Sequence, residues 1–208
     1  MSEANVSDSG PAEARSDPDA GLLRNVLQGD RQAFELLVGR YQSKVYRLAM
    51  GLTHNSQDAE EILQEVFFKV YQNLAEFEGK SAFSSWLYRI ALNTSYMKLR
   101  ERRGSNLVPL DDVINQLEEQ TLDHEADWSS RPDDQLHTSE AMAIIEKAVE
   151  KLPEEFKSVL ILRDIEGFTN EEAGEILELS VPAIKSRLHR ARLLLRQRLD
   201  EFYRQVFE

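Results

Sequence analysis

A run of basic side chains near the carboxyl-terminal end of the sequence carries its clearest functional chemistry. Between Val181 and Arg198 there are six lysines or arginines and no aspartate or glutamate. Ile184, Leu188 and Ala191 recur at helical spacing, which predicts an amphipathic helix with one apolar stripe and basic remaining faces. Lysine and arginine on such a helix can pair with DNA phosphates and donate hydrogen bonds to guanine edges in the major groove.

A shorter helix is predicted immediately before this basic helix. The sequence Thr169-Asn170-Glu171-Glu172 has the form of a capping box, in which two side chains bond the first amides of a helix. Ser180 is suited to cap the next helix and Pro182 to occupy its first turn. This is the pattern of a helix-turn-helix, whose second helix can enter the major groove. A solvated basic surface or a protein-binding helix is the alternative interpretation.

The other polar residues form no recognisable catalytic or metal-binding pattern. The chain has no cysteine, which excludes disulfides and thiolate metal sites. The sequence contains no glycine-rich phosphate loop and no serine, histidine and acid set with suitable placement. Adjacent acids such as Glu60-Glu61 lie at predicted helix starts, where the helix dipole explains them. The sequence therefore predicts a protein that is not an enzyme and that uses no metal and no cofactor.

Charge is distributed unevenly along the chain. The formal net charge is −12, of which residues 104–139 contribute −8, whereas residues 181–198 carry +6. DNA responds to the local field within a Debye length of about 10 Å, so an acidic total does not exclude DNA binding. An acidic total does weaken non-specific DNA binding by the free protein, which suggests that binding needs a partner.

Helical periodicity divides the chain into two predicted domains. Apolar residues recur at spacings of three and four over residues 21–103 and again over 140–208, without an alternating strand pattern. Residues 104–139 are acidic and weakly periodic, as is typical of a linker. Residues 1–20 are predicted to be a disordered tail. We therefore expect an all-α protein with two small helical domains joined by a flexible acidic linker.

The sequence lacks the features of a secreted or membrane protein. Its first residues are polar and acidic, without the basic start and apolar core of a signal peptide. No apolar run approaches the roughly 20 residues that are needed to cross a bilayer. We expect a cytoplasmic protein with no membrane insertion.

Four segments carry a specific family resemblance. They are DAEEILQEVFFKVY at 58–71, FSSWLYRIALN at 83–93, LPEEFKSVLILRDIEGFTNEEAGEIL at 152–177 and VPAIKSRLHRAR at 181–192. In order, spacing and size they resemble a bacterial extracytoplasmic-function (ECF) sigma factor of the sigma-70 family. The resemblance implies two domains, sigma regions 2 and 4, which bind core RNA polymerase, direct it to the −10 and −35 promoter elements and assist DNA melting without catalysing a reaction.

The resemblance places the main polymerase contact on the helix over 58–71. The matching positions are Asp58, Glu61, Gln64 and Glu65, which would face the clamp helices of the largest polymerase subunit. Acid and amide side chains can pair with basic residues of a partner, although acids near a helix start are also common on solvated faces. Region 4 is expected to contact the flap of the second-largest subunit.

The next loop and helix match the part of the family that reads the −10 element. In single-strand recognition a base is flipped out, stacked and hydrogen-bonded on its edge. The matching residues are Phe77, Gly79, Lys80, Ser81, Phe83, Asn93, Lys98 and Arg100. Asn93 is suited to a base edge and the basic residues to phosphates. Trp86 could be a stacking platform or part of the core, and the core interpretation is favoured.

The basic helix matches the −35 reader of the family. Lys185, Ser186, His189 and Arg190 are expected to face the groove, and Arg187 and Arg192 to touch phosphates. For His189, a base contact and a polar surface position remain equally open. No second metal-ligating residue lies at a suitable spacing from this histidine.

The resemblance also implies a regulator and leaves two questions open. Many family members are held by an anti-sigma factor that clamps both domains, so we expect such a partner. The acidic linker either threads towards the polymerase active site or is a solvated tether. The alternative function is a two-domain helix-turn-helix regulator that is not a polymerase subunit. A receiver domain of such a regulator would alternate strands and helices, a pattern that residues 21–103 do not show.

Overall fold

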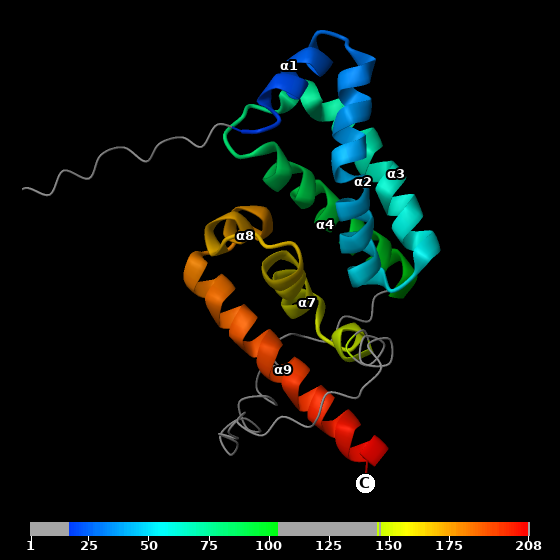
Figure 1. Cartoon of the computed structure of the whole chain (residues 1–208), viewed down its shortest axis with the longest axis vertical. Helices are drawn as coiled ribbons and strands as arrows, with labels where there is room; N and C mark the ends of the chain where they lie inside the picture. Colours follow the sequence, from blue (N-terminus) through cyan, green and yellow to red (C-terminus); the bar gives the residue numbers. More distant parts are fainter. Residues whose placement is uncertain (1–16, 104–144, 146, 208) are drawn as a thin grey trace, which may run out of the picture.

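The described part of the chain consists of helices that form two neighbouring groups. The computed structural model describes residues 17–103, 145 and 147–207, and these contain no strand. The first group contains α1 (Ala20–Leu27), α2 (Arg31–Thr53), α3 (Ser56–Asn73), a 3-10 turn η1 (Leu74–Glu76) and α4 (Phe83–Arg103). The second contains α7 (Glu154–Leu160), a π-helical turn η2 (Ile161–Ile165), α8 (Asn170–Leu177) and α9 (Val181–Phe207). In Figure 1, α9 runs along the outer side of the second group. The expected all-α fold is confirmed.

Local side-chain bonds set several helix starts, as the sequence predicted. The Asn55 side chain accepts a hydrogen bond from the third amide of α3 at 3.0 Å. At α8 the capping box is formed, because Thr169 Oγ1 accepts from the Glu172 amide at 3.1 Å and Glu172 Oε2 accepts from the Thr169 amide at 2.7 Å. Ser180 Oγ accepts from an amide in the first turn of α9 at 3.4 Å. Both predicted caps of the helix-turn-helix are therefore present.

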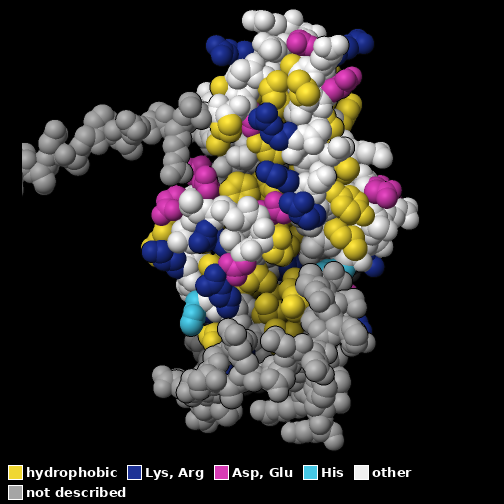
Figure 2. Space-filling model, viewed as in Figure 1, with side chains coloured by type: hydrophobic (Ala, Val, Ile, Leu, Met, Phe, Trp, Pro, Cys, Tyr) yellow, Lys and Arg dark blue, Asp and Glu magenta, His cyan; other side chains and the backbone are white. Residues whose placement is uncertain are grey.

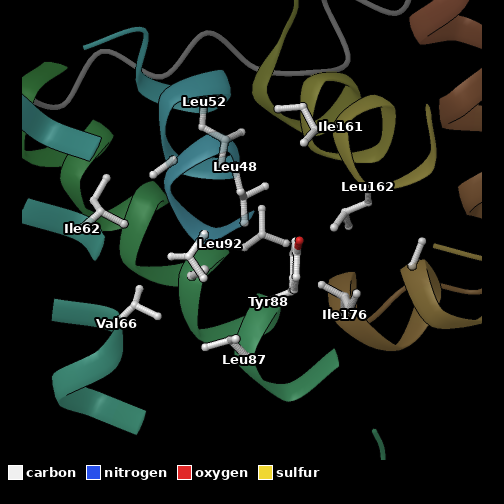
Figure 3. Packing of buried hydrophobic residues seen from close by; sticks show 14 of the residues in the cluster. Leu48, Leu52, Ile62, Val66, Leu87, Tyr88, Leu92, Ile161, Leu162 and Ile176 are labelled. Atoms are coloured by element: carbon white, nitrogen blue, oxygen red, sulfur yellow. The ribbon is translucent and has the colours of Figure 1, made fainter. Parts of the chain in front are cut away.

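A continuous apolar core joins the two groups of helices. The buried residues at the centre are Leu48 and Leu52 of α2, Tyr88 and Leu92 of α4, Ile161 and Leu162 of η2, and Ile176 of α8. In Figure 3, Tyr88 of α4 lies with Leu92 of the same helix on one side and with Leu162 and Ile176 of the second group on the other. The predicted apolar stripe of α9 is also buried, since Ile184, Leu188 and Ala191 are at most 6% exposed.

A polar contact lies at the edge of this shared core. The side chain of Glu166, which follows η2, is only 3% exposed, so its carboxylate is buried. It accepts a hydrogen bond from the Tyr88 hydroxyl at 2.6 Å, and from Arg47 Nε and Nη2 at 3.2 and 3.3 Å. The Tyr88 ring packs edge-on against Phe168 with centroids 4.7 Å apart. The two groups thus form one packed body, although the linker over 104–139 that was predicted between them lies outside the described residues.

The first domain includes residues before residue 21, where the sequence pattern placed its start. Asp19 is fully buried, and its carboxylate accepts hydrogen bonds from Arg40 and the Tyr41 hydroxyl. Asp17 bonds the first amide of α4. Residues 17–19 therefore belong to the first domain, and residues 1–16 of the predicted tail lie outside the described residues.

Candidate nucleic-acid and partner interfaces

The turn between α8 and α9 depends on one buried glycine. The Leu179 amide donates to the Gly174 carbonyl at 2.9 Å, and a Cβ on Gly174 would lie 2.7 Å from the Leu179 carbonyl oxygen. Glu178 adopts a left-handed conformation with φ of 57° and ends α8. This close turn confirms the predicted helix-turn-helix.

The first turns of α9 present the residues predicted to read DNA. Lys185, Ser186 and His189 are exposed, whereas Arg187 and Arg190 are half-buried. Side chains three or four positions apart share one face of a helix, so Lys185 and His189 lie side by side. The helix therefore offers a polar and basic face at its amino-terminal end, as a groove-reading helix requires.

Two arginines of α9 are held by acids of their own domain. Arg192 Nε and Nη2 donate to the Asp164 carboxylate at 3.0 and 2.7 Å, a bidentate pair that raises the pKa of the guanidinium. Arg187 lies 3.5 Å from Glu155. A phosphate contact by either arginine would have to share or replace these acids.

The residues predicted to bind polymerase lie on α3, and three of the four are paired within the chain. Arg102 Nη1 lies 3.2 Å from Asp58 Oδ2, and Lys98 donates to Glu61. Glu65 pairs with Lys69 one turn away at 2.6 Å. The bond from Lys98 lowers the pKa of Glu61. Gln64 is exposed between these acids. The face is therefore acidic and amide-bearing, with α4 supplying part of its counter-charge.

The loop before α4 is anchored by aromatic packing. The Phe77 ring packs edge-on against Phe83 and in a tilted arrangement against Trp86, with centroids 6.0 and 5.2 Å apart. Phe83 is fully buried, so its side chain lies in the core and not on the predicted DNA-reading surface. Trp86 is half-buried in the same aromatic group, in agreement with the favoured core interpretation. The burial of Phe83 argues against a direct contact between its side chain and DNA.

The exposed part of this loop carries the polar residues. Gly79 has a φ of 67°, a conformation that favours glycine. Lys80 is exposed and pairs with Glu78, while Ser81 is half-buried. The loop therefore has a fixed apolar base and a polar tip.

On α4 the predicted residues form an exposed strip with one unexpected member. Asn93 and Arg100 are exposed, and Met97 between them is 53% exposed. These three positions recur at helical spacing on one face. Met97 is not among the residues predicted from the sequence, although its spacing from Asn93 was a usable signal. Lys98 lies on the adjacent face with Glu61. Figure 2 shows basic and acidic side chains interspersed on one side of the molecule.

The described residues were also compared with the requirements of a metal site and of a membrane span. They contain no group of three or more histidine, cysteine, aspartate or glutamate residues that could hold a metal ion. Among the same residues, no helix is long and apolar enough to span a bilayer.

Comparison with known proteins assigns the family. The models of sigma-70 region 2 and sigma-70 region 4 match residues 37–105 and 142–195. The chain is 34% identical to the RNA polymerase sigma-H factor of Pseudomonas aeruginosa, over 90% of this chain and 97% of the relative. It is 35% identical to the ECF RNA polymerase sigma-E factor of Haemophilus influenzae, over 88% and 95% of the two chains. This chain belongs to the sigma-70 family.

Two solved structures share the fold of this sigma factor. CnrH in complex with the cytosolic domain of CnrY has a TM-score of 0.65 at 26% identity, and the match covers 88% of this chain and 97% of that chain. The sigma factor RpoE in complex with the anti-sigma factor NepR from Bartonella quintana has a TM-score of 0.59 at 22% identity, over 80% and 96% of the two chains. Both likenesses extend over most of the described helices.

The family membership defines the function of the chain. As an ECF sigma factor, the chain is a promoter-specific initiation factor for RNA polymerase. The model of region 2 covers most of α2 and all of α3 and α4, and the model of region 4 covers α7, α8 and the first half of α9. The geometry then separates the candidate residues into an α3 face, a loop with an α4 strip, and the start of α9.

Proposed function

We propose that this sigma factor binds core polymerase through α3 and contacts promoter DNA with the loop over 77–82, the α4 strip and the start of α9. The observation that carries the proposal is the exposed row of Lys185, Ser186 and His189 on the second helix of a helix-turn-helix, in a chain whose α3 exposes an acid and amide face. The protein contributes no catalytic step of its own and acts with the polymerase in the cytoplasm.

The α3 face is suited to a basic partner helix. Gln64 and Glu65 lie about one turn after Glu61 on α3, and both are exposed. Within the chain, Lys98 pairs with Glu61 and Arg102 pairs with Asp58. On the polymerase, basic side chains of the clamp helices of the largest subunit would replace Lys98 and Arg102 as the partners of these two acids. Region 4 would contact the flap of the second-largest subunit.

The two DNA elements are assigned to separate surfaces. Asn93 would bond a base edge of the opened −10 strand, while Lys80, Lys98 and Arg100 would neutralise its phosphates. Lys185, Ser186, His189 and Arg190 would face the −35 groove, and Arg187 and Arg192 its backbone.

We also propose a regulatory protein partner. Both solved relatives are complexes with a second protein, and one of those proteins is called an anti-sigma factor. In this chain regions 2 and 4 pack together around Tyr88 and Glu166, so a single partner could contact both at once. An anti-sigma factor would bind this arrangement, in which regions 2 and 4 pack together, more tightly than the arrangement that the two regions adopt when they are bound to polymerase.

Co-elution with core RNA polymerase in gel filtration tests the polymerase contact. Gln64→Ala with Glu65→Lys should abolish co-elution, since both positions are exposed and the Glu61 pair with Lys98 is left intact. Glu35→Lys, an exposed acid on α2, is the matched control and should co-elute like the wild type. Wild-type protein that fails to co-elute but binds duplex DNA alone would instead indicate a helix-turn-helix regulator.

Selection of DNA tests the assignment of the promoter surfaces. The holoenzyme would select promoters from a randomised duplex library, and the selected duplex would be the probe for variants. Lys185→Ala should relax the preference at one −35 position by about 1–3 kcal/mol, the range of one base contact. An unchanged −35 preference in this variant would exclude Lys185 as a base reader.

A further inference from the structure

The start of α4 is capped by a residue that lies far away in the sequence. The Phe83 amide donates to Asp17 Oδ2 at 2.7 Å, across 66 residues. The first amides of a helix have no partner within the helix, and a carboxylate there also interacts favourably with the helix dipole. The other carboxylate oxygen of Asp17 accepts from the Asp19 amide at 2.9 Å. One side chain thus fastens the amino-terminal segment to the end of the DNA-reading loop.

A second contact fixes this segment to α2. The buried Asp19 carboxylate does not cap its own helix α1 but accepts from the Tyr41 hydroxyl and from Arg40. The Tyr41 ring packs edge-on against Phe83 with centroids 5.6 Å apart. Burial, together with the Asp19 carboxylate, raises the pKa of the Tyr41 hydroxyl, which therefore remains a donor. The turn over residues 17–19 consequently contacts Phe83 in two ways. Asp17 binds the Phe83 amide, and Asp19 binds Tyr41, whose ring packs on the Phe83 ring.

The loop over 77–82 lies between two anchors as a result. At one end Phe77 packs on Phe83 and Trp86. At the other end the chain enters α4 at Phe83, whose amide is bound by Asp17. Between these anchors, the tip of the loop with Gly79 and Lys80 is exposed. Loss of the Asp17 bond would free one end of the loop without removing any residue from its DNA-reading tip.

We propose that Asp17 is a positioning residue for promoter recognition, which holds the loop over 77–82 in the conformation that accepts the −10 strand. This inference rests on the proposed role of that loop. Asp17 itself touches no DNA and acts only through Phe83. The amino-terminal segment thereby takes part in −10 recognition, although its acidic composition would repel DNA.

The test measures three affinities of the full-length protein. Asp17→Ala, assembled with core polymerase, should lose about fivefold in affinity for the non-template −10 strand of a selected promoter, as expected for an N-cap bond of ordinary strength. Co-elution with the polymerase and affinity for the −35 duplex should be unchanged. Asp17→Asn, whose amide oxygen can still accept the Phe83 amide, should recover most of the strand affinity. Lys80→Ala reports the contribution of the loop tip.

Fluorescence quenching of the folded protein distinguishes a local effect of Asp17 on the loop from a general loss of stability. The chain has two tryptophans, so Trp128→Phe leaves Trp86, which packs on Phe77, as the only one. In that background Asp17→Ala should increase acrylamide quenching of Trp86 well below the unfolding transition. Lower global stability alone would move the transition and leave this native baseline in place.

The outcomes distinguish the inference from the proposed function. Wild-type strand affinity in Asp17→Ala, with a loss in Lys80→Ala, overturns the positioning role and leaves the loop as the −10 reader. Wild-type affinity in both variants overturns the role of the loop and this inference with it. If Asp17→Ala does not fold, Asp17→Glu takes its place, since it displaces the carboxylate by one methylene group. Wild-type strand affinity in that variant overturns the inference.

Discussion

The hydroxyl of Tyr88 in region 2 donates a hydrogen bond to the carboxylate of Glu166 in region 4, at 2.6 Å and across 78 residues. The carboxylate is almost completely buried, so the bond replaces water that Glu166 would otherwise bind. Arg47, which is half-exposed, supplies the opposite charge. The contact between regions 2 and 4 therefore contains a buried acid of region 4. Among the described residues, its carboxylate accepts hydrogen bonds from Tyr88 and Arg47, which both lie in region 2.

Tyr88→Phe should lower the free energy of unfolding by about 1–3 kcal/mol, the cost of leaving a buried acceptor without one of its donors. Urea denaturation measures this change. Tyr71 is an exposed tyrosine of α3. Tyr71→Phe is therefore the matched control and should change the free energy of unfolding by less than about 0.5 kcal/mol. Combining Tyr88→Phe with Glu166→Gln should cost less than the sum of the two single changes. Equal effects of the two tyrosine variants would contradict the structural role of the Tyr88 bond.

The features that the sequence predicted correctly are local. The capping box at Thr169, the Ser180 cap and the buried stripe of α9 depend on residues within a few turns, and such patterns repeat reliably. The two-domain all-α fold followed from the same periodicity. Among the candidate residues, Gln64, Lys80, Asn93, Lys185 and His189 are exposed, whereas Phe77 and Phe83 pack in the aromatic group, and the roles of all of them stay predictions.

The features that the sequence did not reveal depend on distant partners. Glu166 and Asp19 look like ordinary surface acids in the sequence, because a buried acid is recognisable only when its donors are brought next to it. Phe83 was assigned to the DNA-reading set from the family resemblance, whereas in the structure its side chain is buried in the core. The pairing of Glu61 with Lys98 likewise requires α3 and α4 to lie side by side.

Two glycine substitutions should change stability in opposite directions. Gly174→Ala would bring a Cβ to within 2.7 Å of the Leu179 carbonyl oxygen, so the turn between α8 and α9 must shift. We expect a loss of about 1–3 kcal/mol, as for other overpacked sites. Gly39 of α2 has open space around its Cβ position, so Gly39→Ala should stabilise the helix by about 0.5–1 kcal/mol. Thermal unfolding of both variants checks the pair, and a stable Gly174→Ala protein would show that the turn is not close-packed.

The pKa of Glu61 should report the α3–α4 contact. Hydrogen bonds from Lys98 and Gln57 hold it below its ordinary value of 4.5. Because the folded-state pKa is lowered, the stabilising effect of the pair is complete above pH 4.5 and is lost as the pH falls through the lowered value. Lys98→Met should raise the pKa of Glu61 towards 4.5. Lys69→Met, which removes the partner of Glu65, should leave it unchanged. NMR titration of the Glu61 carboxyl carbon measures its pKa in the two variants. The same Glu61 pKa in Lys98→Met and Lys69→Met would show that Lys98 does not bind Glu61 in solution.

Arg192 should exchange Asp164 for a phosphate when region 4 binds the −35 element. If so, Arg192→Ala reduces the slope of log K against log salt concentration by about 0.9, the value for one phosphate contact. Asp164→Asn should raise the affinity for the −35 duplex, because the guanidinium is no longer held by the bidentate pair. Glu171→Gln removes the same charge from an exposed position on α8 and measures the long-range part of this gain. A gain in Asp164→Asn no larger than that in Glu171→Gln, with an unchanged salt slope in Arg192→Ala, would show that the pair serves only to hold α9 on η2.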